Sequence, residues 1–204
     1  WQISVGDEIV GLAKFRETLV IFCKDSIYRL AGSSVADFVL QPVTRNIGCS
    51  SRFSIQEIGG DLIYLAPDGL RTIAGTEKIG DTELGTISKQ VQARLITLNE
   101  GQINNISSHV IRGKSQYRMY YPSPTATEAN STGLMAVLKR SADTGQIGWE
   151  YADLKGIKPL CATHGNISNQ DIILHGDYDG GYVYQQENGN TFDGVNMTCT
   201  YRTI

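Results

Sequence analysis

The sequence has few of the features that point to a particular chemistry. Its 204 residues include 5 prolines and 3 histidines, and only 19% are charged. No histidines form an H-x-x-x-H or H-E-x-x-H pattern, and no cysteines are spaced C-x-x-C. There is no phosphate-binding P-loop and no G-x-S-x-G elbow. The motifs that are typical of zinc sites, nucleotide-binding proteins and α/β-hydrolases are therefore missing, and the sequence does not predict any of these classes.

Long apolar stretches are also missing. The longest apolar run covers residues 19–23, whereas a membrane span needs about 20 residues. No charged segment followed by an apolar one suggests a signal peptide. We therefore expect no membrane-spanning segment. The first residue is Trp1 rather than Met, which suggests a piece of a longer polypeptide or a processed one.

Neither sign of charge dominates. The chain carries 18 Lys and Arg against 21 Asp and Glu, a formal net charge of -3. Tight binding to nucleic acid needs a strongly basic face, so it is not expected. A surface past which DNA moves without binding remains compatible with this charge.

The four cysteines do not define a metal site. An even number leaves two disulfides possible, but the favoured interpretation is buried free thiols in strands. Such thiols would suggest synthesis in a reducing compartment. The cysteines are Cys23, Cys49, Cys161 and Cys199.

One segment repeats along the chain. Residues 19–32 (LVIFCKDSIYRLAG) align without a gap with residues 62–75 (LIYLAPDGLRTIAG), at an offset of 43, and Asp25 falls on Asp68. Each copy predicts a β-hairpin, because an apolar run is followed by a polar turn and a second strand. The Pro-Asp-Gly turn at 67–69 is favourable because Pro fixes φ and Gly accepts a positive φ. A weaker copy covers residues 171–184.

Further strands are predicted at residues 116–121, 134–138 and 147–151, and an exposed loop at 122–133. A short amphipathic helix of two or three turns is the exception to an all-β chain. Its apolar residues are spaced by four, and we expect them to pack on the domain itself. They are Ile87, Val91 and Leu95, with Ser88 as the possible N-cap.

Hairpins that recur every 40–45 residues are typical of β-propeller blades. We therefore predict an all-β fold of propeller-like blades with one short helix. At this period, residues 1–204 hold about four blades. Four blades can close a ring, but an incomplete propeller from a longer chain is an equally good interpretation.

No residue constellation predicts catalysis. We expect each of the histidines His109, His164 and His175 to be a surface or hydrogen-bonded strand residue. A glycosidase would need two carboxylates at a set separation, for which Glu57, Asp61 and Asp68 are candidates. The segment from Asp177 to Gly180 lacks the ligand pattern of a calcium loop and predicts a hairpin turn. We therefore predict no catalytic, cofactor-binding or metal-binding residues and no enzymatic activity.

Several short motifs resemble a family of tailed-phage virion proteins. The similarity is to the podophage tail nozzle, also called tail tubular protein B, and it extends over most of the chain. The motifs lie at residues 11–22, 46–49, 67–71, 175–185 and 201–203.

The resemblance implies a non-enzymatic structural protein of the virion, assembled in the host cytoplasm. It implies a hexameric ring with propeller domains around a DNA channel, in contact with other tail proteins such as the adaptor and tail fibres. Genomic DNA would pass through this channel during ejection without specific binding. No binding residues carry over from the family to this chain.

Two alternatives stay open. One is a carbohydrate-binding or receptor-binding propeller, a tail adhesin, with the Tyr-rich segment 117–121 as its surface. Aromatic rings in a concave pocket would favour it. The other, with less support, is a propeller glycoside hydrolase.

Overall fold

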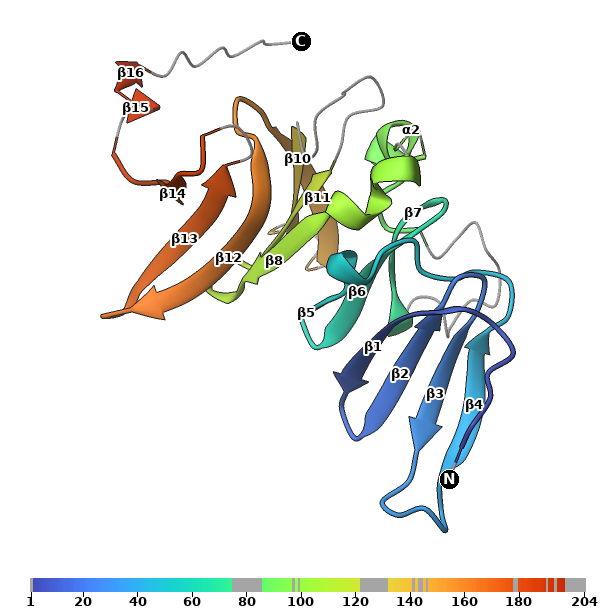
Figure 1. Cartoon of the computed structure of the whole chain (residues 1–204). Helices are drawn as coiled ribbons and strands as arrows, with labels where there is room; N and C mark the ends of the chain where they lie inside the picture. The colour runs from blue at the N-terminus through green and yellow to red at the C-terminus, as the bar shows by residue number, and fades with distance from the viewer. Residues whose placement is uncertain are drawn as a thin grey trace.

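The chain folds into a row of antiparallel β-sheets (Figure 1). The computed structural model describes residues 2–74, 86–96, 98, 100–121, 132–140, 142, 145, 147–177, 180–189, 191–192 and 194–196. Four sheets have three or four strands, and each is built from strands consecutive in the chain. In Figure 1 they follow chain order from the N-terminal sheet, in blue, to the C-terminal one, in orange. No sheet closes on itself among the described residues.

The strands of the first two sheets are β1 (Ile9–Phe15), β2 (Thr18–Cys23), β3 (Ile27–Ala31) and β4 (Val39–Thr44), then β5 (Gln56–Ile58), β6 (Asp61–Ala66) and β7 (Gly69–Thr72). The third sheet contains β8 (Ser107–Ile111), β9 (Gln116–Tyr121), β10 (Thr132–Arg140) and β11 (Ile147–Leu154). The fourth contains β12 (Pro159–Ile167), β13 (Gln170–Asp177) and β14 (Val183–Gln186). A last ladder pairs β15 (Thr191–Phe192) with β16 (Val195–Asn196).

Both copies of the repeat form the predicted hairpins. The first forms β2 and β3, and the second forms β6 and β7. The second turn is tight, since Ala66 pairs directly with Gly69. Gly69 has a φ of +130°, which a residue with a side chain rarely adopts. The strands predicted at 116–121, 134–138 and 147–151 are also confirmed, as β9 and parts of β10 and β11.

The β5–β7 sheet is buried on both faces. Leu62 and Tyr64 of β6 pack towards β1–β4, in a cluster with Phe22 and Val20. The intervening Ile63 of β6 joins a second cluster with residues of β9 and β10. An unbroken apolar run is what a strand covered on both sides requires.

The short helix differs from its prediction. A single 3-10 turn, η2 (Lys89–Val91), leads into the four-residue α2 (Gln92–Leu95). Ser88 does not cap it with its side chain. Its hydroxyl instead accepts a hydrogen bond from the backbone N–H of Leu70, 2.8 Å away, because Ser88 is fully buried against β7. Leu95 is buried in the β5–β10 cluster, as the packing prediction requires.

The remaining 3-10 turns are η1 (Arg52–Ser54), η3 (Glu100–Asn105) and η4 (Arg112–Lys114). The predicted exposed loop at 122–133 is wrong at its end, because residues 132 and 133 begin β10 and pair with β9. Residues 122–131 lie outside the described part of the chain. Among the described residues, no helix has the length and apolarity that crossing a membrane requires.

Candidate functional site

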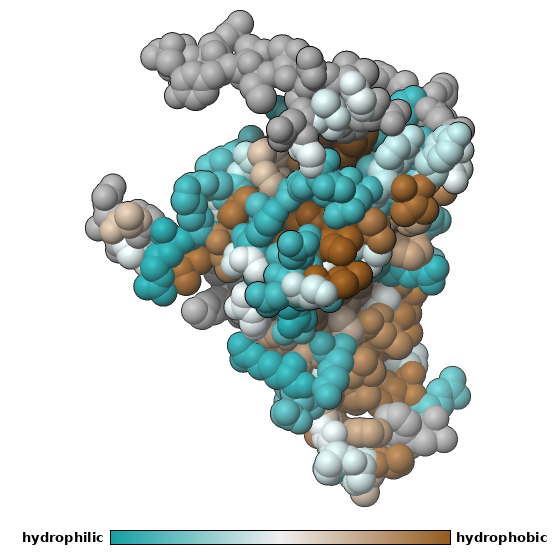
Figure 2. All heavy atoms as spheres, turned by 90° about the vertical axis from the view of Figure 1, so that its left-hand side faces the viewer, coloured by the Kyte–Doolittle hydropathy of each residue, from teal (hydrophilic) through white to brown (hydrophobic). Residues whose placement is uncertain are grey.

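The contact between the third and fourth sheets differs from the others, because it is polar. β12 lies alongside β8, and the backbone N–H of Ala162 donates to Ser107 Oγ at 3.0 Å. Figure 2 shows the side of the molecule that includes β12–β14, where hydrophilic residues cover much of the surface and apolar ones appear between them. We call the contact between β8–β11 and β12–β14 the polar seam.

Arg118 of β9 is the centre of the polar seam. Alternation along β9 sends Tyr117 and Met119 into the apolar cluster with β5–β7, and leaves Arg118 on the opposite face. Its side chain is only 3% exposed. A buried guanidinium is tolerated only when carboxylates or other acceptors surround it.

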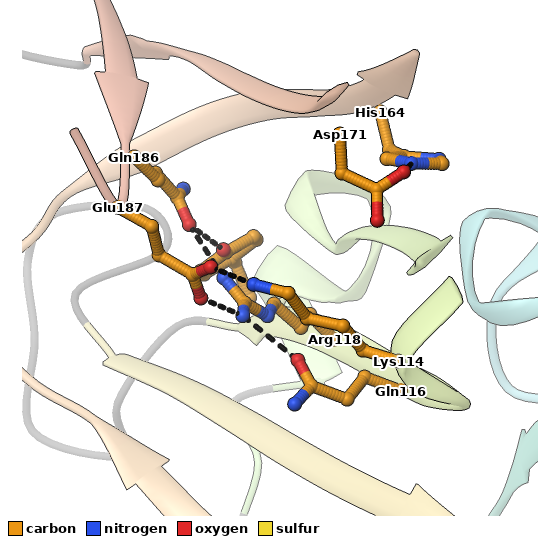
Figure 3. Close-up of polar contacts among 8 residues, drawn as sticks. Lys114, Gln116, Arg118, His164, Asp171, Gln186 and Glu187 are labelled. Carbon is orange, nitrogen blue, oxygen red and sulfur yellow. Dashed lines mark hydrogen bonds and ion pairs between the residues drawn. The ribbon is translucent and has the colours of Figure 1, made fainter. Parts of the chain in front are cut away.

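Three side chains hold Arg118 (Figure 3). Its Nη2 donates to Gln116 Oε1 at 2.8 Å, and its Nη1 to Gln186 Oε1 at 3.1 Å. Glu187 forms an ion pair with both Arg118 and Lys114. Burial on its own would raise the pKa of Glu187, but hydrogen bonds from Lys114 and Arg118 hold it below its usual value.

Backbone geometry helps to place this carboxylate. Glu187 directly follows β14 and has a left-handed φ of +58°. A non-glycine residue in this region costs about 1 kcal/mol or more and persists only where the surroundings determine it. Here the ion pairs with Arg118 and Lys114 provide that constraint.

The three histidines of the chain lie at this seam. His109 pairs with Arg118 across β8 and β9 and is stacked near Tyr120, with ring centroids 5.9 Å apart. Both ring nitrogens of His109 are buried and lack a hydrogen-bond partner. Burial, followed by the charges of Arg118 and His164, lowers the pKa of His109 to about 4. The neutral imidazole is therefore the form that this site accepts.

The expectation of surface or hydrogen-bonded histidines is therefore wrong for His109 and confirmed for the other two, which have partners. His164 Nε2 lies 3.0 Å from Asp171 Oδ1, in a pair to one side of the Arg118 cluster (Figure 3). His175 Nδ1 lies 3.1 Å from the amide nitrogen of Gln186. Among the described residues, no three His, Cys, Asp or Glu side chains gather as a metal site.

Comparison with known proteins does not assign this chain to a family. No protein-family model and no curated protein matches this chain. Any function must therefore be argued from the residues themselves.

The candidate glycosidase carboxylates have structural partners. Glu57 is ion-paired with Arg112 at 3.7 Å. Asp61 accepts backbone hydrogen bonds from Leu62 and Ala74. Asp61 begins β6 and Asp68 follows its end, so that strand geometry separates them by roughly 20 Å.

Asp68 belongs to a second ion pair, in which the arginine is buried and the aspartate is partly exposed. It accepts a 2.9 Å hydrogen bond from Nε of the fully buried Arg71 and another from the Thr86 hydroxyl. Burial would raise the pKa of Asp68, but these hydrogen bonds outweigh it and lower the pKa.

The turn predicted at residues 177–180 is confirmed at both ends. Asp177 Oδ2 accepts from the backbone N–H of Gly180 at 3.1 Å, and the Asp177 N–H donates to the Tyr182 carbonyl. Residues 178 and 179 lie outside the described part.

The prediction of buried free thiols in strands holds for Cys23, holds for burial but not for the strand at Cys49, which lies between β4 and η1, and fails for burial at Cys161. Cys23 and Cys49 are buried and free, and burial raises the pKa of Cys49 to about 11. Cys161 is free but exposed, because it lies on the open face of β12. Cys199 falls outside the described residues.

No pattern in the sequence predicts that Arg118, Lys114, Gln186 and Glu187 form a cluster. One signal was present, a lone arginine in the otherwise apolar and Tyr-rich segment 117–121. Its partner Glu187 lies 69 positions away, and no local pattern connects the two.

Proposed function

We propose that this chain is a non-enzymatic structural protein of a phage virion, a propeller-like part of a tail nozzle or tail tube. In this proposal it forms a ring, hexameric as the family resemblance implies, that channels DNA during ejection. Its neighbours would be other tail proteins, such as the adaptor and tail fibres. Two of the motifs that resemble the tail-nozzle family lie in paired strands of hairpins. They are residues 67–71, with β7, and residues 175–185, with β13 and β14.

The equivalence of the two repeat copies carries the proposal. Each forms the second and third strands of its sheet, and the two sheets are successive and packed face to face. Propeller blades are antiparallel sheets of about four consecutive strands that pack on their neighbours in this way. The four sheets here have three or four consecutive strands each.

The first strands of successive sheets also approach one another, as the inner strands of blades do. Gln56 of β5 donates through Nε2 to the Ser108 carbonyl of β8 at 3.1 Å. On its other side β8 adjoins β12. These three strands line a shared hollow of about 390 Å³. This convergence supports a radial arrangement of blades.

The charge of the chain is compatible with a DNA channel. A net charge of -3 provides no excess of cations for counterion-releasing contacts with phosphates. DNA would therefore move past such a surface without being held.

The alternatives have weaker support. The hydrolase would need two carboxylates free to act on a substrate, whereas Glu57, Asp61 and Asp68 each have a structural partner, and Asp61 and Asp68 lie at opposite ends of β6. The carbohydrate-binding surface proposed at residues 117–121 is wrong, because Tyr117, Tyr120 and Tyr121 are buried in β9.

Electron microscopy of the purified protein tests the proposal. A ring with sixfold symmetry and propeller-like density in each subunit is the expected result. A monomer at high protein concentration, with one closed propeller, would contradict it.

A further inference from the structure

The outer face of the first sheet is apolar. Cross-strand pairing places alternate side chains of β1–β4 on the side away from the second sheet, and none of them belongs to the two apolar clusters. An antiparallel sheet with one face in water normally alternates apolar and polar residues. On the β1–β4 outer face, however, a single residue is charged. The face consists of Leu12, Lys14, Leu19, Ile21, Tyr28, Leu30, Leu40 and Pro42.

The repeat indicates what this face is built to contact. Leu62 and Tyr64 of β6 pack against the sheet that precedes theirs. At the repeat offset of 43, these positions correspond to Leu19 and Ile21 of β2. The run of β2 is apolar without interruption, like that of β6, which is covered on both sides. The first sheet therefore has the sequence of a sheet that another sheet precedes.

The β1–β4 outer face is accessible at its edge. Leu12 of the edge strand β1 is 59% exposed. Leu19, Leu30 and Leu40 are half-buried. A second apolar surface on this face would remove these side chains from water, which is favourable.

The fourth sheet has the other free face of the row. Gln186 of β14 points to the third sheet, where it bonds Arg118, so that the alternate residues of β12–β14 point away from it. Val183 is 72% exposed on this side. The β12–β14 outer face has no charged residue in its paired strands. It consists of Cys161, Thr163, Gly165, Ile172, Leu174, Gly176, Val183 and Gln185.

These two faces are of opposite kinds. Each sheet contact within the chain joins the face that one sheet turns towards the next with the face that the next sheet turns back. The first sheet leaves a backward face open and the fourth leaves a forward face open, as far as the described residues show. The two sheets lie at opposite ends of the row, so that these faces do not meet within one copy (Figure 1). A second copy supplies to each face the kind that it lacks.

We propose that the β12–β14 outer face of one copy packs on the β1–β4 outer face of the next copy. The interface rests on the ring of the proposed function and identifies the surfaces that join its subunits. A head-to-tail contact of this kind uses two different surfaces and forms a ring where the rotation between copies closes.

The size of the faces explains why closure matters. Four strands about 4.8 Å apart, each rising about 3.3 Å per residue over about six residues, give a face of roughly 400 Å². A stable interface between two proteins buries about 800 Å² per partner. A single contact is therefore weak. In a closed ring every copy makes two contacts, and the second one forms within the same assembly, which strengthens the whole.

Sedimentation velocity of the 204-residue chain tests the interface. Leu12→Glu and Val183→Glu each place a carboxylate on one of the two faces, at a side chain that is exposed in the single copy. Each variant is expected to weaken self-association at least about tenfold, because a carboxylate buried without a partner is costly. Ile147→Glu is the matched control. Ile147 of β11 is 60% exposed and lies on neither face, so that this variant should associate like the natural chain. Circular dichroism shows whether each variant folds.

Mixing the two variants tests the head-to-tail arrangement. Leu12→Glu leaves the β12–β14 outer face intact, and Val183→Glu leaves the β1–β4 outer face intact. At millimolar concentration the mixture should form dimers with one copy of each variant and nothing larger, because both remaining faces carry a carboxylate. If two β1–β4 outer faces packed on each other instead, Val183→Glu would associate normally and no mixed dimer would form.

The outcomes separate the interface from the ring. A ring that both variants leave intact, or a mixture without dimers, would overturn this interface and leave the ring of the proposed function in place. Open head-to-tail chains that both variants dissolve would support the interface and refute the ring. A natural chain that stays monomeric at millimolar concentration would refute both.

Discussion

At the scale of single residues, His109 is the least satisfied group in the polar seam. It is 5% exposed, with two unpaired ring nitrogens beside the cationic Arg118. Protonation would put a second positive charge next to this arginine, away from water. The cost of that charge makes His109 a source of acid sensitivity.

We expect the free energy of unfolding to fall as the pH drops from 6.5 to 4. In this range the unfolded chain protonates His109 and the folded chain does not, so that acid favours unfolding. The contribution of His109 to this loss should approach about 3 kcal/mol and be complete near pH 4, below which carboxylates with lowered pKa values, such as Asp68 and Glu187, continue the loss. His175, whose pKa is also lowered by burial, adds to it in the same direction.

Urea denaturation followed by circular dichroism between pH 4 and 7 measures this loss. His109→Leu, which removes the titrating group, should give a flatter profile than the natural chain. Parallel profiles for the two proteins would show that His109 is not responsible.

The ion pair between Asp68 and Arg71 supports a second prediction. Asp68→Asn leaves a fully buried guanidinium without its carboxylate, and should cost about 3 kcal/mol of unfolding free energy. Asp25→Asn is the matched control, because Asp25 occupies the same position in the first repeat copy and is exposed. Urea unfolding curves compare the two variants.

Removing both charges completes this test. The double variant Asp68→Asn with Arg71→Met should recover part of the stability, since the buried charge is gone. Equal, small effects of Asp68→Asn and Asp25→Asn would mean that the ion pair contributes nothing.

At the scale of elements, the passage from the first sheet to the second depends on Gly48. A Cβ at this position would lie 2.0 Å from the carbonyl oxygen of Lys24, in the turn between β2 and β3. The backbone N–H of Cys49 donates to the Cys23 carbonyl at 2.9 Å, which holds the two segments together. The chain can follow this path only without a side chain.

Gly48→Ala should therefore lower the thermal unfolding temperature by about 4–8 °C, which corresponds to roughly 2 kcal/mol of overpacking. Gly148→Ala in β11 is the control, because a Cβ there meets nothing within 4 Å. Its temperature should stay the same or rise slightly. Equal melting temperatures for the two variants would contradict the close approach at Gly48.

The hairpins could be predicted from the sequence because neighbouring residues determine them. The run at residues 62–66 and the Pro-Asp-Gly turn after it carry their own structural preference. The hydrogen bond that Ser88 forms could not be predicted in this way. Its hydroxyl bonds the backbone of Leu70, 18 residues away, so that tertiary packing overrides its capping preference.

The burial of residues 117–121 was misjudged for a related reason. Tyrosine serves equally well on an exposed binding surface and in a core where its hydroxyl finds a partner. The Tyr117 hydroxyl donates to the Ser54 carbonyl, 63 positions away, a contact that no local pattern reveals. The whole polar seam depends on pairings of this long-range kind.

At the scale of the whole molecule, the three sheet contacts are not equivalent. The first two are apolar clusters, around Phe22 and Tyr64 and around Leu65 and Met119. The third, the polar seam, depends on hydrogen bonds and on ion pairs to the partly exposed Glu187. Burying apolar surface stabilises more reliably than partly exposed ion pairs, which contribute little and weaken in salt.

We therefore expect the β12–β14 sheet to open before the others. In hydrogen–deuterium exchange measured by mass spectrometry, amides at residues 159–177 should exchange earlier than those at residues 61–72, which lie between two apolar clusters. Raising NaCl from about 0.05 to 0.5 M should speed exchange in 159–177 and leave 61–72 unchanged. Simultaneous exchange of both segments, at either salt concentration, would mean that the network around Arg118 couples the fourth sheet to the rest as firmly as apolar packing does.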